Sequence, residues 1–285
     1  MVWTRIDGIQ GLPLDLMAAR IGRRHYAPHS HEEFAIGVCT GGLEAIRYRG
    51  ELRYNGPGSV VVVEPGEPHT GGPANEQGFA YRVLYPAPSL LAELGRGALP
   101  HFRDAIIADD DLARRMWTVH RALTRRPGQG ARPEPLEGES MLLSLLDVLV
   151  RRHAGRSAGA AVLGGRRHDT AAAWIARTVS VRLADELTGP PTLEEMAADL
   201  GLSRYQVLRG FREIMGMPPY AWLAQHRVAR ARSLLDAGLP PAEAAARVGF
   251  ADQAHLTRWF RRVLGVTPGA YRNSVQDGTG RAIRD

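Results

Sequence analysis

The sequence predicts an α+β protein of two domains, with a β-rich N-terminal half and an all-helical C-terminal half. Short apolar runs separated by glycine fill residues 24–86, as expected for a small antiparallel β-sandwich or barrel. Two similar helix-turn-helix patterns occupy about 192–215 and 241–264. Positive charge is concentrated in the same half, because residues 203–272 contain 11 arginines against four acidic residues. A basic helical domain of this kind favours an acidic partner.

Composition limits the class of protein. The chain has 285 residues, of which 44% are hydrophobic, so two folded cores are expected. Cys39 is its single cysteine, which excludes an intrachain disulfide and zinc fingers built on cysteines. Residues 1–10 lack the apolar segment of a signal peptide, and the apolar run Met141–Val150 is about half a membrane span. We therefore expect a cytoplasmic protein.

The boundary between the halves is a stretch rich in glycine, alanine, serine and arginine. Its lack of hydrophobic periodicity is typical of a flexible linker. We predict an N-terminal domain at 1–153, a linker at 154–169 and a C-terminal domain at 170–285.

Strands and then helices are expected along the N-terminal domain. Glu44–Tyr48 alternates polar and apolar residues, as a strand with one face in water does, and Ser59–Val63 contains four valines, which suits a fully buried strand. Further strands are predicted at Phe34–Cys39, Leu52–Tyr54 and Gly78–Tyr85, and helices at 88–95, 104–124 and 136–153. The last helix has a broad apolar face that either packs on the β-domain or forms part of a dimer interface.

Two histidine-containing motifs lie among the strands. His29-Ser30-His31 resembles the first cupin motif, and Pro65-Gly66-Glu67-Pro68-His69 resembles the second. The glutamate of the first motif is missing, because Ala35 and Ile36 stand where it is expected. We favour histidines that line a pocket or a turn without metal, and the alternative is a divalent metal at His29, His31 and His69. The expected effector-binding residues are His29, His31, Glu33, His69 and Arg82.

The C-terminal domain contains an internal repeat. After the first turn come Val207, Arg209 and Phe211, and 49 residues later Leu256, Arg258 and Phe260 follow the second. In the first unit Thr192 and Glu195 form a capping box, Gly201 supplies the turn and Ser203 caps the second helix. In the second unit Pro241 starts the short helix, Ala245, Ala246 and Val248 pack inward, Gly249 turns and Asp252 caps.

The outward face of each second helix carries side chains that can read bases or hold phosphates. We predict these DNA-contacting residues: Arg204, Tyr205, Leu208, Arg209 and Arg212 in the first unit, and Gln253, Ala254, His255, Thr257, Arg258, Arg261 and Arg262 in the second. Arg209 and Arg258 are the predicted base readers, and Arg262 the predicted phosphate contact.

The C-terminal hundred residues resemble the AraC/XylS family of transcription regulators. The resemblance rests on Arg227-Val228, Leu234-Leu235, Ala245 to Phe250, and Gly265-Val266-Thr267-Pro268 through Tyr271-Arg272. It implies two helix-turn-helix units joined by a helix at about 219–237, and a cupin-like N-terminal barrel that binds a small-molecule effector and dimerises through its helices.

The resemblance also implies function. We expect a homodimeric regulator of promoter DNA, an activator rather than a repressor, with RNA polymerase as a partner and with no catalytic residue or cofactor. The alternative is a metal-dependent cupin enzyme fused to a DNA-binding domain. A DNA-architectural protein with an inert barrel is a third reading.

Overall fold

The computed structural model describes residues 1–9, 12–23, 25–95, 97–125, 133, 135–155 and 171–279. The chain divides into two compact units. The first comprises Met1–Tyr26, His31–Gly159 and Ser274–Asp285, and the second Ala27–Ser30 and Ala160–Asn273. The predicted linker at 154–169 lies almost wholly outside the described residues.

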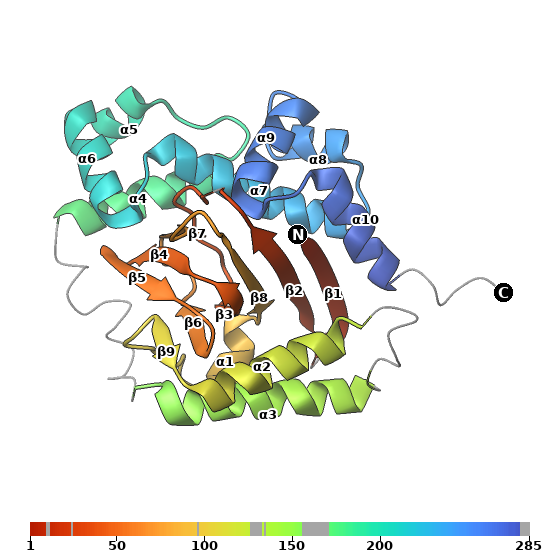
Figure 1. Ribbon diagram of the computed structural model, residues 1–285. Helices are drawn as coiled ribbons and strands as arrows, with labels where there is room; N and C mark the ends of the chain where they lie inside the picture. Colours follow the sequence, from red (N-terminus) through yellow and green to blue (C-terminus); the bar gives the residue numbers. More distant parts are fainter. Residues whose placement is uncertain are drawn as a thin grey trace. The chain divides into compact units, whose positions relative to one another are not determined.

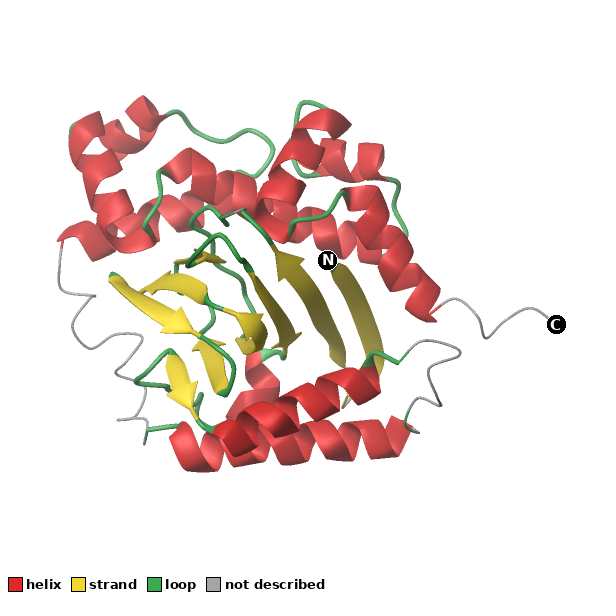
Figure 2. Cartoon of the chain, viewed as in Figure 1, coloured by secondary structure: helices red, strands yellow, loops and turns green. Residues whose placement is uncertain are grey.

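The first unit is built on two antiparallel sheets (Figures 1 and 2). The larger sheet has the strand order β1-β2-β8-β3-β6-β9 and the smaller has the order β5-β4-β7. The strands are β1 (Val2–Ile9), β2 (Leu12–Ile21), β3 (Ala35–Gly42), β4 (Glu44–Tyr48), β5 (Glu51–Asn55), β6 (Ser59–Val63), β7 (His69–Pro73), β8 (Phe79–Tyr85) and β9 (Ile106–Ala108). The predicted sandwich or barrel is therefore a pair of open sheets among the described residues.

Several strand predictions are confirmed and four strands were missed. One of them, β9, lies within the helix expected at 104–124, which begins only at Asp110, after its cap Asp109. β4 and β6 have the predicted bounds, and the four valines of β6 are at most 7% exposed. β1 and β2 precede the region in which strands were expected. β7, with the sequence His-Thr-Gly-Gly-Pro, was also missed because glycine and proline are poor strand formers.

Helices cover one face of the large sheet. They are α1 (Pro88–Leu94), α2 (Asp110–Leu123) and α3 (Pro135–His153), and α2 packs against both α3 and the sheet. Alternate residues Ile36, Val38 and Leu84 point to this face and form a core with Leu112, Met116 and Leu146, all at most 3% exposed. The strand period of two thus assigns the alternate residues, such as Gly37 of β3 and Tyr81 and Val83 of β8, to the face toward the small sheet.

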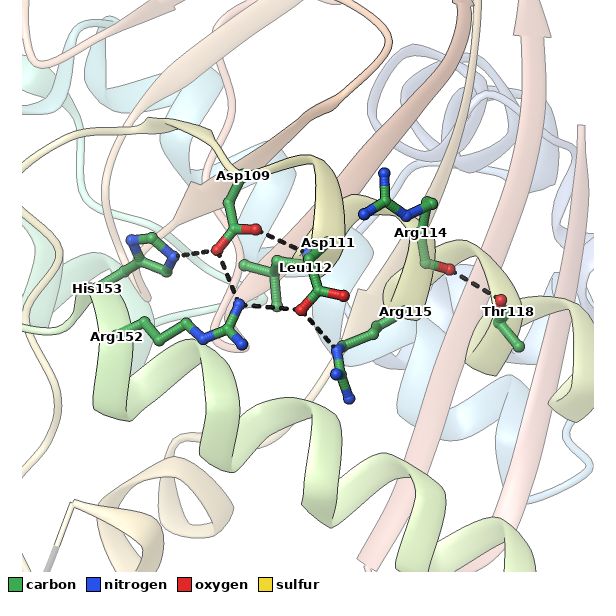
Figure 3. Close-up of polar contacts among 8 residues, drawn as sticks. All are labelled: Asp109, Asp111, Leu112, Arg114, Arg115, Thr118, Arg152 and His153. Atoms are coloured by element: carbon green, nitrogen blue, oxygen red, sulfur yellow. Dashed lines mark hydrogen bonds and ion pairs between the residues drawn. The ribbon is translucent and has the colours of Figure 1, made fainter.

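A polar cluster joins the start of α2 to the end of α3 (Figure 3). Asp109 caps α2 by accepting from the Leu112 backbone N–H at 2.9 Å, and its other oxygen lies 2.8 Å from Nε2 of His153. Arg152 reaches both Asp109 and Asp111, at 3.3 and 3.0 Å. The Leu112 N–H and the basic neighbours lower the pKa of Asp109 to about 2. The last turn of α3 is thereby fixed to the first turn of α2.

The second unit is helical. It comprises α4 (Ala171–Asp185), α5 (Leu193–Asp199), α6 (Arg204–Met215), α7 (Pro219–Asp236), α8 (Pro241–Arg247), α9 (Gln253–Leu264) and the first half of α10 (Pro268–Thr279). α4, α5, α6 and α7 share one apolar core, in which Val207 and Phe211 are fully buried. α6 approaches α4 closely at Gly210, where an added Cβ would lie 2.8 Å from Ile175. In the described part of the chain, no helix is long and apolar enough to cross a membrane.

Candidate functional site

The first helix-turn-helix unit consists of α5, a turn and α6. Thr192 and Glu195 form the predicted capping box at the start of α5. The turn contains Gly201 with φ of 63°, a left-handed conformation that favours glycine. Ser203 caps α6 as predicted. It also forms a second capping box with Gln206, which was not predicted although the Ser-x-x-Gln spacing signals it. The local sequence therefore fixes both ends of the turn.

The second unit consists of α8, a turn and α9. Pro240 and Pro241 start α8, and Gly249 has φ of 83° in the turn. Asp252 caps α9 by accepting from the His255 backbone N–H at 2.6 Å. Ala244 and Ala245 are fully buried, whereas the side chain of Ala246 is exposed, so the inward prediction for Ala246 is wrong. The buried face of α8 consists of residues one helical turn apart, so Ala244 and Val248 lie on the same face.

Each second helix buries one face and exposes the other. Leu256 and Phe260 of α9 are fully buried, as are their counterparts Val207 and Phe211 of α6. Most predicted DNA-contacting residues are exposed: Arg204, Tyr205, Arg209, Arg212, Gln253, Ala254, Arg258, Arg261 and Arg262. Leu208, His255 and Thr257 are half-buried. The helix period thus brings the predicted residues of each unit to one outer face.

The two predicted base readers have unengaged guanidinium groups. Within the described part of the chain, neither Arg209 nor Arg258 has a hydrogen-bond or ion-pair partner. Arg204 differs, because it lies 3.6 Å from Glu194 on α5. Arginine pairs with guanine O6 and N7 through two parallel hydrogen bonds, so Arg209 and Arg258 can contact base edges without breaking an internal contact.

The outer face of α9 is braced by the start of α7. The hydroxyl of Tyr220 lies 3.3 Å from Nε2 of His255, and the Tyr220 ring packs edge-on against Trp259 at 6.2 Å. Arg262 in turn lies over Trp259, with its guanidinium carbon 5.1 Å from the ring centre. Neither Tyr220 nor Trp259 was identified from the sequence, since the two residues are 39 positions apart and no local pattern signals their contact.

α7 also links the two helix-turn-helix units through a buried arginine. Arg227 is 5% exposed, and its Nε and Nη2 atoms donate to the Leu187 carbonyl oxygen, which precedes α5, at 2.9 and 2.6 Å. The same guanidinium lies 5.8 Å from the ring centre of Phe250 in the turn of the second unit. α7 therefore holds the two helix-turn-helix units, with α6 and α9, on one frame.

Two of the predicted effector-binding histidines lie together in the N-terminal compact unit, which contains the β-sheets. The rings of His31 and His69 are 4.9 Å apart, and His31 also packs edge-on against Tyr85 at 5.6 Å. Nδ1 of His31 donates to the Glu33 carbonyl oxygen at 2.8 Å, which places Glu33 beside it through its backbone. His29 belongs to the helical compact unit, which includes Ala27–Ser30. Across the described residues, no three side chains of the metal-ligating types lie close enough to hold an ion.

Arg82 lies on the other face of the large sheet. Arg82 pairs with Val38 of β3, on the side of the sheet that α2 covers. Its Nη1 donates to Nδ1 of His120 at 3.2 Å. His120 donates from Nε2 to the Met17 carbonyl oxygen at 3.0 Å, while burial and the charge of Arg82 lower its pKa to about 4. Arg82, another expected effector-binding residue, therefore lies on the helix-covered face of the sheet, apart from the His31–His69 pair.

Comparison with known proteins agrees with this architecture. Residues 12–146 match the model of the AraC-like ligand binding domain, and residues 196–274 match a helix-turn-helix domain. An uncharacterized HTH-type transcriptional regulator, YbfI of Bacillus subtilis, is 24% identical over 80% of each chain. The HTH-type transcriptional activator AarP of Providencia stuartii is 27% identical over 38% of this chain and 82% of its own.

Solved structures show the same two-domain fold. Apo ToxT K231A of Vibrio cholerae superposes with a TM-score of 0.55 at 11% identity, over 92% of this chain and 97% of ToxT. Together, the paired ligand-binding and helix-turn-helix domains show that this chain belongs to the AraC family of transcriptional regulators.

Proposed function

We propose that this protein activates transcription by binding promoter DNA through α6 and α9, under the control of a small molecule bound by its N-terminal domain. The equivalence of Arg209 and Arg258 carries the proposal. They occupy matching exposed positions on two separately capped helices, and α7 joins the two units. Two helices placed one helical turn apart along a duplex can enter successive major grooves on the same side.

The N-terminal domain supplies the regulation. A small molecule that binds two states of the protein with different affinities shifts the population toward the one that binds DNA. A ToxT structure with an unsaturated fatty acid bound, TM-score 0.54 to this chain, supports a ligand-binding role for this fold. His29, His31, Glu33 and His69 are the proposed effector contacts, and no metal is required.

The proposal also includes the domain boundaries, a homodimeric state and a cytoplasmic location. The functional domains span 1–153 and 170–285, with a linker at 154–169. Trp117 of α2 and Leu136 of α3 are 37% and 75% exposed, which supports a homodimer through these helices. The dimer contacts RNA polymerase in the cytoplasm and has no enzymatic activity, in keeping with relatives that are transcriptional regulators.

Selection of binding sites from random-sequence DNA, followed by footprinting with the full-length protein, tests the proposal. We expect two protected elements per protomer, separated by roughly one helical turn. An Arg209→Ala/Arg258→Ala double variant serves as the control and should leave no preferred sequence. Enrichment of no sequence by the wild-type protein would contradict the proposed function.

A further inference from the structure

A buried carboxyl group lies between the two sheets of the N-terminal domain. Glu44 of β4 is 6% exposed, and its side chain is on the same face as those of Ile46 and Tyr48. Its Oε2 accepts a hydrogen bond from Nδ2 of Asn55 at 3.0 Å. Asn55 is fully buried and is itself fixed by Ser59, whose hydroxyl donates to Oδ1 at 2.8 Å. One oxygen of Glu44 is therefore held by a rigid polar chain.

The other oxygen has no such partner. Oε1 lies over β7, where a Cβ added to Gly71 would be 3.0 Å from it. Across the described residues, Asn55 is the single hydrogen-bond partner of the Glu44 carboxyl group, and no arginine or histidine forms an ion pair with it. Burial accordingly raises the pKa of Glu44 to about 7. A buried carboxylate without a cation is costly, and a bound positive charge would offset that cost.

Two tyrosine rings lie near the same region, Tyr81 from the large sheet and Tyr26 from the segment between β2 and β3. The hydroxyl of Tyr81 on β8 donates to that of Tyr26 at 3.1 Å, and the backbone N–H of Tyr26 donates to the Gly71 carbonyl oxygen at 2.7 Å. The Tyr26 ring also lies 3.8 Å from the position of an added Gly71 Cβ. The charge of Glu44 acts across the sandwich on Tyr81 and Cys39, whose pKa values it helps to raise. His69 lies on the same strand as Gly71, opposite Tyr48.

We infer that the effector of the N-terminal domain carries a protonated amine, which Glu44 binds through Oε1 while the rings of Tyr26 and Tyr81 contact it. A carboxylate beside aromatic faces is an arrangement that recognises ammonium groups. A neutral hydroxyl would satisfy the hydrogen bond but would leave the buried charge uncompensated. The inference rests on the proposed function, since it specifies the chemistry of the molecule that this domain binds.

Binding of an amine to this site is coupled to a proton. Near neutral pH a fraction of Glu44 is protonated, and the incoming R–NH3⁺ binds the carboxylate form. The Glu44 proton is released to solvent, and the amine keeps its own three protons. Affinity for an amine therefore rises as the pH increases toward and above 7, as long as the amine stays protonated.

Isothermal titration calorimetry of the full-length protein tests the inference. The probes are benzylamine, cyclohexylamine and butylamine, each compared with its hydroxyl counterpart: benzyl alcohol, cyclohexanol and butanol. We expect at least one amine to bind ten-fold or more tightly than its alcohol, with proton release detected from buffers of different ionisation enthalpy. Glu44→Gln keeps the Asn55 contact and should reduce the preference at least ten-fold. Glu51→Gln, at an exposed position on β5, should leave it unchanged.

Two further measurements keep the test decisive. If Glu44→Gln does not fold, the pH dependence of amine affinity in the wild-type protein from pH 5 to 8 replaces it, and a flat profile overturns the inference. A panel in which no amine is preferred, or a preference that survives Glu44→Gln, overturns it as well. If no amine binds but a neutral or anionic compound alters DNA affinity, the amine inference is wrong and the proposed function is still supported. Should amines bind through Glu44 without altering DNA affinity, the effector control fails instead.

Discussion

α4 covers the first helix-turn-helix unit, whereas α10 and the start of α7 cover the second. Phe211 of α6 lies in the core that α4 completes, with Trp222 edge-on at 6.3 Å, while its counterpart Phe260 packs against Tyr271 at 5.5 Å. The outer faces differ too. Tyr205 on α6 is 69% exposed, but His255 and Trp259 on α9 contact Tyr220. The two units thus share a backbone arrangement, but the outer face of α9 is supported by Tyr220 whereas Tyr205 on the outer face of α6 is exposed.

This contrast has a consequence for recognition. Side chains already held in place lose less conformational freedom on binding than exposed ones do. We expect α9 to discriminate between bases with little rearrangement, and α6 to accept more variation in its DNA element.

The largest expected effect is on stability, and it is the same in both units. Phe211→Ala and Phe260→Ala each remove a fully buried ring and should lower the free energy of unfolding by about 3–5 kcal/mol. Urea denaturation followed by circular dichroism measures this, with the exposed Tyr205→Ala as the control, expected within about 0.5 kcal/mol of wild type. A much smaller loss for one phenylalanine would show that its unit relaxes around the cavity.

The next effect separates the two DNA elements. Arg209→Ala and Arg258→Ala should each cost about 1–3 kcal/mol of binding free energy and relax preference at their own element. Fluorescence anisotropy with the selected site, and with versions scrambled in one element, measures it. Arg230→Ala, exposed on α7, is the matched control. Equal losses on specific and scrambled DNA would mean that these arginines contact phosphates.

The caps give a smaller effect that distinguishes the units. Ser203→Ala and Asp252→Ala each remove an N-cap and should cost about 1 kcal/mol of stability. The loss at Asp252 should be the larger, because its carboxylate also interacts favourably with the positive end of α9. Asp252→Asn keeps the cap without the charge, and thermal unfolding at low and high salt resolves the two contributions. A salt-independent difference would argue against the charge.

Arg262 should alter affinity without altering sequence preference. Its stacking on Trp259 leaves the guanidinium at the side of α9, as suits a phosphate contact. Arg262→Ala should weaken binding to all sequences alike and reduce the slope of log K against log salt by about one. Arg262→Lys retains the charge and should retain the slope. A loss confined to the second element would instead identify Arg262 as a base reader.

The smallest effect is a pH dependence restricted to the first unit. The backbone N–H and hydroxyl of Thr192 hold the pKa of Glu195 below its ordinary value. A lowered carboxyl pKa stabilises the fold above the ordinary value, and this stabilisation is lost as the pH falls through the lowered one. Glu195→Gln should therefore flatten the acid limb of stability measured between pH 7 and 3. α8 starts with Pro240 and Pro241 and has no equivalent carboxylate cap.

The sequence predicts the C-terminal unit better than the N-terminal one, for physical reasons. Caps such as Thr192 and Asp252 are local, because the side chain and the N–H it satisfies are three residues apart. The position of Arg82 depends on which face of β8 the helices cover, and alternation alone does not specify a face. The Glu44–Asn55 contact joins adjacent strands, and no local motif announces it.

Arg227 couples the folding of the two helix-turn-helix units. Its guanidinium satisfies the Leu187 carbonyl beside the first unit and stacks on Phe250 of the second, at a site where little water reaches. Unfolding either unit leaves a buried charge partly uncovered, so intermediates with one unit folded are disfavoured. The domain should melt in a single cooperative transition, and duplication of the motif has therefore produced one folding unit rather than two.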